Sequence, residues 1–113
     1  MQTVGKDGRI PVAILGATGA VGQRMVQLLA GHPRLRLSEV AASERSQGKT
    51  YLEATRWILP GDVPEEARGL VVKAVDGPLE SRLVLSALDA AVADTVEPLQ
   101  ASRGKLVVSN TKS

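Results

Sequence analysis

Apolar residues in this chain gather in five short runs, of which residues 10–15 are the most continuous, and two stretches between the runs repeat apolar residues with a helical period. Continuous runs rich in Val, Ile and Leu are typical of strands that are buried on both faces. The runs predict strands at residues 10–15, 35–42, 70–75, 83–88 and 106–109. The periodic stretches predict helices at residues 20–30 and 90–102, and a glycine follows each of them closely.

The alternation of strands and helices predicts an α/β fold with a Rossmann-like, doubly wound and mainly parallel sheet. Because one helix joins the first two strands and another joins the last two, these pairs are expected to be parallel with right-handed crossovers. The expected order has the first strand in the centre, the second and third on one side, and the fourth and fifth on the other. Residues 1–113 are expected to form one domain.

Two segments have weaker patterns. Residues 43–50 are polar and have no apolar period, so we expect a loop there, and residues 55–60 lead into a Pro-Gly-Asp turn. Pro98 falls inside the second helical stretch. Because proline is tolerated in the first turn of a helix, we expect this helix to begin near Asp94 or Thr95.

Composition and charge narrow the function classes. Lys and Arg total 14 and Asp and Glu total 12, and no basic run is interleaved with aromatic residues, so we expect no nucleic-acid partner. The chain has no cysteine, which excludes disulfides, thiolate metal sites and a cysteine nucleophile within it, and we expect no metal site. Residues 1–9 are polar and no apolar run approaches the length of a membrane span, so we expect a cytoplasmic protein without membrane contact.

The strongest functional signal lies where the first predicted strand meets the first predicted helix. Gly16, Gly19 and Gly22 are spaced by three residues there. Such a turn gathers unpaired main-chain N–H groups and the positive end of the helix dipole at one point, and leaves room for a pyrophosphate. The pattern favours dinucleotide binding, with the Thr18 hydroxyl as a further contact to a phosphate. The alternative is a tight turn whose glycines serve packing only.

The end of the second strand favours NADP over NAD. NAD-binding folds commonly carry an acid about 20 residues after the glycines, which holds the ribose hydroxyls. This chain has Ser43, Arg45 and Ser46 there, and a guanidinium flanked by hydroxyls suits a 2′-phosphate. Glu44 keeps NAD as an alternative, and a solvated polar loop without a ligand is another.

The ends of the last two strands are expected at the same edge of the sheet. The small residues in Ser86-Ala87-Leu88 would let the main chain approach the nicotinamide half of a dinucleotide. The alternative is a strand-to-helix turn in which Ser86 or Asp89 caps the helix. Asn110 follows the fifth strand and could hold a substrate or the cofactor amide.

Several motifs together resemble the N-terminal domain of aspartate-β-semialdehyde dehydrogenases. They follow one another in order through nearly the whole chain, and the segment from Ala42 to Lys49 is far more specific than the glycines. The matching residues are Gly16-Ala-Thr-Gly-Ala-Val-Gly-Gln23, Leu28-Leu29, His32-Pro33, Ala42-Ser-Glu-Arg-Ser-Gln-Gly-Lys-Thr-Tyr51, Trp57, Ser86-Ala-Leu-Asp-Ala90, Glu97-Pro98 and Val107-Val-Ser-Asn110. The related N-acetyl-glutamyl-phosphate reductases share the glycine turn and the His-Pro pair, but fit the polar loop less well.

The resemblance implies the NADP-binding part of an oxidoreductase that reduces β-aspartyl phosphate to the semialdehyde, in the biosynthesis of lysine, threonine and methionine. It implies cofactor contacts at Gly16, Thr18, Gly19, Ala20, Val21 and Gly22. It also implies that Ser43, Arg45 and Ser46 hold the 2′-phosphate, that Ser86, Ala87 and Leu88 lie near the nicotinamide ribose, and that Asn110 begins the floor of the active site.

The family's chemistry also needs a cysteine nucleophile and a histidine acid–base, and both fall beyond residue 113. We therefore expect a cofactor domain that lacks the substrate and dimerisation domain, is inactive alone, and associates with itself or with the missing domain. A short-chain reductase is disfavoured because it would need a Tyr-x-x-x-Lys pair, and Thr55 lies four residues after Tyr51. A non-catalytic dinucleotide-sensing module needs no nucleophile and stays open.

Overall fold

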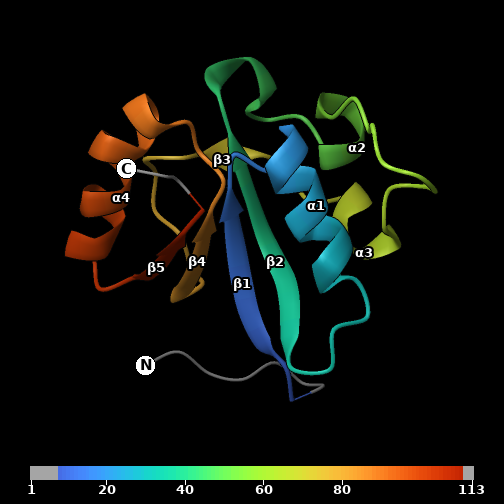
Figure 1. Ribbon diagram of the computed structural model, residues 1–113, viewed down its shortest axis with the longest axis horizontal. Helices are drawn as coiled ribbons and strands as arrows, with labels where there is room; N and C mark the ends of the chain where they lie inside the picture. The colour runs from blue at the N-terminus through green and yellow to red at the C-terminus, as the bar shows by residue number, and fades with distance from the viewer. Residues whose placement is uncertain (1–7, 111–113) are drawn as a thin grey trace.

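The computed structural model describes residues 8–110, which form a five-stranded sheet with helices against it (Figure 1). The strands are β1 (Ile10–Leu15), β2 (Leu35–Ala42), β3 (Lys73–Ala74), β4 (Leu83–Ser86) and β5 (Leu106–Ser109). Neighbouring strands are parallel, and the order is β3-β2-β1-β4-β5. The predicted Rossmann-like α/β fold, with the first strand in the centre, is therefore confirmed.

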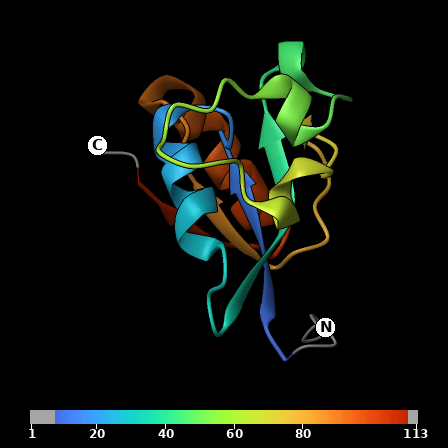
Figure 2. The same ribbon diagram turned by 90° about the vertical axis from the view of Figure 1, so that its right-hand side faces the viewer.

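Helices cover both faces of the sheet, as the two views in Figures 1 and 2 show. α1 (Ala20–Leu29) packs on one face together with the short helices α2 (Tyr51–Ala54) and α3 (Glu65–Arg68). α4 (Ala90–Ser102) packs on the other face. A 3₁₀ turn, η1 (Glu44–Ser46), follows β2.

The central strand β1 serves both cores. Val12 and Ile14 belong to the apolar cluster on the α1 face, whereas Ala13 and Leu15 belong to the cluster on the α4 face. All four residues are fully buried, which explains why the sequence pattern is continuous rather than alternating. The turn that follows β1 therefore rises from a strand that is paired on both edges and packed on both faces.

The third strand is much shorter than the sequence predicts. Only Lys73–Ala74 pairs parallel with β2, while residues 70–72 pair antiparallel with residues 48–51. The Val72 N–H donates to the Lys49 carbonyl at 2.8 Å, and the Tyr51 N–H donates to the Leu70 carbonyl at 2.8 Å. The chain after β2 turns back at Gly48, whose φ of +84° suits glycine, and so supplies the partner for this apolar run.

The last helix begins earlier than the sequence predicts. α4 starts at Ala90 after Asp89, so Pro98 lies inside the helix rather than in its first turn. The Pro98 ring is exposed, and Asp94, whose carbonyl loses its i+4 donor there, is exposed as well. Water can therefore satisfy that carbonyl, and the helix continues. The fourth strand also differs from its prediction, because β4 ends at Ser86 rather than at Leu88.

Candidate functional site

The turn between β1 and α1 is tied to the ends of the neighbouring strands. The N–H groups of Gly16 and Ala17 both donate to the Ala41 carbonyl at the end of β2, at 2.8 and 3.1 Å. Gly16 has a φ of +75°, and a Cβ built on it would lie 3.0 Å from the Ala87 carbonyl oxygen. Glycine is thus required at position 16 by both its backbone conformation and its close approach to the turn after β4.

The other two glycines of the turn have different roles. A Cβ on Gly22 would lie 2.1 Å from the Gly16 carbonyl oxygen, so this glycine lets α1 pack against the turn. A Cβ on Gly19 would meet only that same oxygen, at 3.7 Å, which is an ordinary contact. The packing of the protein therefore does not require glycine at position 19, and the space beside it is open to a ligand.

The N-terminus of α1 presents free N–H groups next to Gly19. Gly19 is the N-cap and provides no side-chain cap, and the first turn of the helix contains no acidic residue. By helix geometry, the N–H groups of Ala20 and Val21 have no acceptor within the helix, and both residues are exposed. A helix end with these properties is suited to an anionic ligand.

The turn after β2 is an exposed polar loop. Ser43 and Arg45 are exposed, Ser46 is half-buried, and the Ser46 N–H donates to the Ser43 carbonyl at 2.9 Å to close the 3₁₀ turn. No residue from 8 to 110 accepts a hydrogen bond from the Arg45 guanidinium. The charged side chain of Glu44 shares this turn.

The turns after β4 and β5 complete the same edge. The Ala87 N–H donates to the Leu15 carbonyl at 2.9 Å, and the Asn110 N–H donates to the Ser86 carbonyl at 2.9 Å. Ser86 and Gly22 are both buried. The Ser86 side chain and the Gly22 Cα therefore pack beneath the turns and do not form part of the open surface. The thirteen predicted site residues lie at one edge of the sheet, at the carboxyl ends of β1, β2, β4 and β5. Most are in the turns that follow these strands, whereas Ala20, Val21 and Gly22 form the first turn of α1 and Ser86 ends β4.

Two buried polar residues that contact the glycine turn were not among the predicted site residues. The Tyr51 hydroxyl donates to the Ala17 carbonyl at 2.7 Å. The Gln23 Nε2 donates to the Thr18 carbonyl at 3.0 Å and to the Arg56 carbonyl at 2.9 Å. Gln23 is the last residue of the glycine motif, and Tyr51 is the last residue of the polar-loop motif. An amide on the core side of an amphipathic helix predicts a buried side chain with hydrogen-bond partners, and this signal could have identified Gln23.

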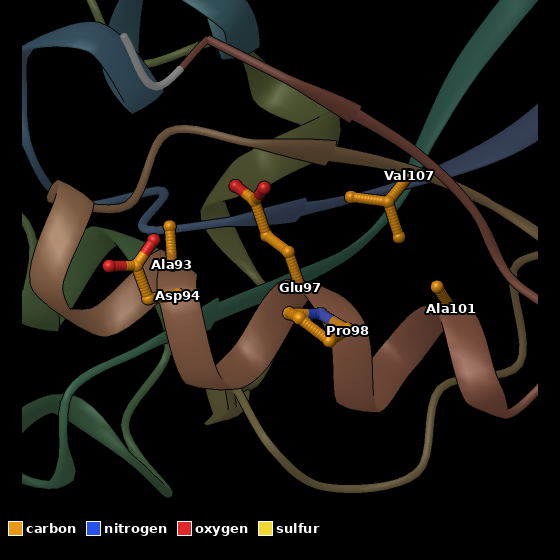
Figure 3. A pocket seen from close by; sticks show the side chains of 6 residues that line it. All are labelled: Ala93, Asp94, Glu97, Pro98, Ala101 and Val107. Atoms are coloured by element: carbon orange, nitrogen blue, oxygen red, sulfur yellow. The ribbon is translucent and has the colours of Figure 1, made fainter. Parts of the chain in front are cut away.

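A groove of about 360 Å³ lies between α4 and β5 (Figure 3). Asp94 and Glu97 line it, and the Ser109 hydroxyl donates to the Glu97 carboxylate at 2.8 Å. Two carboxylates disfavour an anionic ligand. Among residues 8–110, no three His, Cys, Asp or Glu side chains are grouped so as to hold a metal ion, and no helix is long and apolar enough to span a membrane.

Comparison with known proteins identifies the family of the domain. A profile of the family described as "Semialdehyde dehydrogenase, NAD binding domain" matches residues 11–113. The chain is 42% identical over 106 residues to an aspartate-semialdehyde dehydrogenase of Archaeoglobus fulgidus, which covers 93% of this chain and 31% of that protein. It is 39% identical over 108 residues to the aspartate-semialdehyde dehydrogenase of Saccharomyces cerevisiae, and this match covers 94% of this chain and 30% of that protein.

Solved structures give the same picture. Aspartate semialdehyde dehydrogenase from Candida albicans with NADP superposes with a TM-score of 0.87 at 38% identity, over 92% of this chain and 30% of that one. Aspartate semialdehyde dehydrogenase II from Vibrio cholerae superposes with a TM-score of 0.66 at 29% identity, over 91% of this chain and 28% of that one. The chain spans about 30% of the length of such relatives. It belongs to the semialdehyde dehydrogenase family, as an NAD(P)-binding domain of the aspartate-semialdehyde dehydrogenase type.

Proposed function

We propose that this domain binds NADP at the carboxyl edge of its sheet, with the pyrophosphate at the N-terminus of α1 and the 2′-phosphate at the turn after β2. The observation that carries the proposal is the open space at Gly19 beside the free N–H groups of Ala20 and Val21. A pyrophosphate needs both features, and a turn that served packing alone would need neither. When bound, NADPH supplies a hydride.

The choice of NADP over NAD rests on the exposed Ser43–Arg45–Ser46 turn. The structural relative from Candida albicans was solved with NADP, which agrees with this choice. The remaining predicted contacts are assigned to the nicotinamide half: the half-buried Ala87 and Leu88, the buried Ser86 beside them, and Asn110 just after β5. Gly22 and Ser86 act through the turns that they support, because both are buried.

The preference for NADP can be tested at Arg45. Wild-type protein should bind NADP more tightly than NAD, and Arg45→Ala should lower NADP affinity about tenfold or more, since a charge-assisted contact contributes about 1.5–3 kcal/mol. NAD affinity should change little. Fluorescence or calorimetric titration of both nucleotides is the measurement. Arg34→Ala is the matched control, because Arg34 is also exposed but lies at the opposite end of β2. Equal wild-type affinities for the two nucleotides would contradict the assignment.

We further propose that the domain serves a whole enzyme that reduces β-aspartyl phosphate to the semialdehyde, in the biosynthesis of lysine, threonine and methionine. This rests on the names of the relatives and on the resemblance of the motifs. Residues 8–110 would provide only the cofactor half of such a site. Cytoplasmic localisation remains a prediction from the sequence.

The chain by itself is expected to be inactive. It has no cysteine, and its only histidine, His32, lies between α1 and β2, at the edge opposite the glycine turn. The Arg34 and Leu35 N–H groups donate to its Nδ1 at 3.0 Å each, so that nitrogen already serves a local turn. Purified protein should form no NADPH from aspartate semialdehyde, NADP and phosphate. NADPH formation above a control without protein would contradict this.

Self-association through β5 is a further expectation. β5 is an edge strand, and Leu106 and Val108 are 61% and 50% exposed on the face turned away from α4. An apolar edge of this kind favours pairing with another chain. Sedimentation velocity over a concentration series should detect a dimer that Val108→Lys weakens. A wild-type protein that stays monomeric at every concentration would refute the expectation.

A further inference from the structure

The four carbonyl groups of the glycine turn, from Gly16 to Gly19, all point to donors within the protein. Gly16 accepts from the Gly19 N–H at 3.3 Å, and Gly19 accepts from the Gln23 N–H at 2.8 Å. The other two carbonyls have no main-chain donor and depend on side chains. Ala17 accepts from the Tyr51 hydroxyl and Thr18 from the Gln23 amide.

We propose that Tyr51 and Gln23 are positioning residues for the cofactor, which hold the Ala17 and Thr18 carbonyls inward and so direct the turn toward the pyrophosphate. The inference rests on the proposed function. In a planar trans peptide the C=O and the following N–H point in opposite directions. A carbonyl of Ala17 fixed inside the protein therefore turns the Thr18 N–H outward, and no residue from 8 to 110 accepts from that N–H.

Tyr51 is suited to be a permanent donor. Its side chain is fully buried, and its hydroxyl lies 2.7 Å from the Ala17 carbonyl oxygen. Burial raises the pKa of Tyr51 to about 12, so the hydroxyl keeps its proton throughout the neutral range. The residue is anchored in turn, because its own N–H donates to the Leu70 carbonyl. Phenylalanine would keep the packing and remove only the hydroxyl.

The Gln23 amide is held in one orientation. Its Nε2 donates both hydrogens, to the Thr18 and Arg56 carbonyls, and its Oε1 accepts from the Ile58 N–H at 2.9 Å. Rotating the amide by half a turn would bring its oxygen against two carbonyls, so the network permits one arrangement. Gln23 is 2% exposed, so bulk water does not reach the amide.

Both side chains connect the pyrophosphate turn to one segment, residues 51–58, which follows the turn proposed for the 2′-phosphate. If their role is positioning, their loss should affect ligands that carry the pyrophosphate and spare a ligand that carries only the 2′-phosphate. If their role is merely structural, both ligands should weaken in parallel.

The experiment compares NADP with adenosine 2′-monophosphate, which lacks the pyrophosphate, by titration of wild type, Tyr51→Phe and Gln23→Met. Gln100→Met is the matched control, since Gln100 is also buried and donates to two carbonyls, Val75 and Gly77, outside the glycine turn. We expect NADP affinity to fall about tenfold in the two test variants, with less than about a twofold change for the monophosphate. Gln100→Met should leave both affinities unchanged.

A second measurement uses the wild-type chain alone, so that the test does not depend on the folding of a variant. In a ¹H–¹⁵N spectrum, added inorganic pyrophosphate should shift the Thr18 amide signal together with those of Ala20 and Val21. An unmoved Thr18 signal, unchanged NADP affinity in both variants, or parallel loss of both ligands would overturn the inference. Wild type that binds neither NADP nor pyrophosphate would instead overturn the proposed function.

Discussion

Replacing Gly22 with alanine should lower the free energy of unfolding by about 3 kcal/mol and abolish nucleotide binding with it, because overpacking against a rigid backbone is costly. The added Cβ would lie 2.1 Å from the Gly16 carbonyl oxygen and 2.7 Å from the Ala17 Cα. These are main-chain atoms of a turn that directly follows the fully buried residues 12–15 of β1, so neither can move without loosening the sheet. Either α1 separates from the turn or the turn loses its shape.

Gly19→Ala is the control for this experiment. Its Cβ would meet only the Gly16 carbonyl oxygen, at 3.7 Å, so the fold should tolerate it. Alanine is a poorer N-cap than glycine, which costs at most about 1 kcal/mol. Because the same Cβ would occupy the space proposed for the pyrophosphate, NADP affinity should nevertheless fall by about tenfold or more.

Urea unfolding and nucleotide titration of the two variants separate the two roles. Gly22→Ala should shift the unfolding midpoint strongly, whereas Gly19→Ala should shift it little and lose binding. A stable Gly22→Ala protein would mean that the helix can retreat from the turn at low cost. Undiminished NADP binding by Gly19→Ala would remove the observation on which the proposed function rests.

The parts of the fold that could be predicted from sequence are those with strong local patterns. β1, its glycine turn and α1 follow directly from a buried run, three spaced glycines and a helical period. The location of the candidate site could also be predicted, because the carboxyl ends of all strands of a parallel sheet lie at one edge. The predicted strands were therefore sufficient to place Gly16, Arg45 and Asn110, which are distant in sequence, at the same edge of the sheet.

The parts that could not be predicted depend on distant partners. Residues 70–72 have the composition of a parallel strand, but their partner is the segment that folds back at Gly48. The early start of α4 depends on Pro98 facing solvent, which a one-dimensional pattern does not reveal. Gln23 and Tyr51 acquire their roles only when the turn and residues 51–58 meet.

Glu39 is a further case of this kind, and it depends on a bulge in β2. Val12 pairs with Leu37 while Ala13 pairs with Glu39, so one residue of β2 has no partner between them. Leu37 belongs to the core on the α1 face. By simple alternation Glu39 would follow it into that core, and the extra residue instead turns Glu39 to the α4 face.

On that face Glu39 joins three elements. Its side chain is 4% exposed. Its carboxylate lies 2.7 Å from the Lys73 Nζ of β3 and accepts from the Glu80 and Ser81 N–H groups just before β4. Burial by itself would raise the pKa of Glu39, but the Lys73, Ser81 and Glu80 hydrogen bonds outweigh it and lower the pKa from 4.5 to about 2. The folded state therefore binds this proton much more weakly than the unfolded chain does.

The domain should lose stability in acid because of this one group. The pKa of Glu39 is lower in the folded state, so its contribution is complete above about pH 4.5 and disappears as the pH falls through about 2. The shift corresponds to about 3 kcal/mol at 1.36 kcal/mol per pKa unit. Unfolding free energies measured by urea titration from pH 7 to pH 2 should show the loss.

Glu39→Gln tests whether Glu39 is the source of that loss. The variant should be less stable at pH 7 by about 3 kcal/mol, since an amide leaves Lys73 unpaired and sets its own NH₂ against the N–H groups that the carboxylate accepted from. It should also lose most of the decline between pH 5 and pH 2. Glu65→Gln, at an exposed position in α3, is the matched control and should keep the wild-type profile. If Glu39→Gln retained the full loss of stability between pH 5 and pH 2, other carboxyl groups would be responsible for the acid sensitivity. The Glu39 hydrogen bonds to β3 and to the residues before β4 would then contribute less to stability than their geometry indicates.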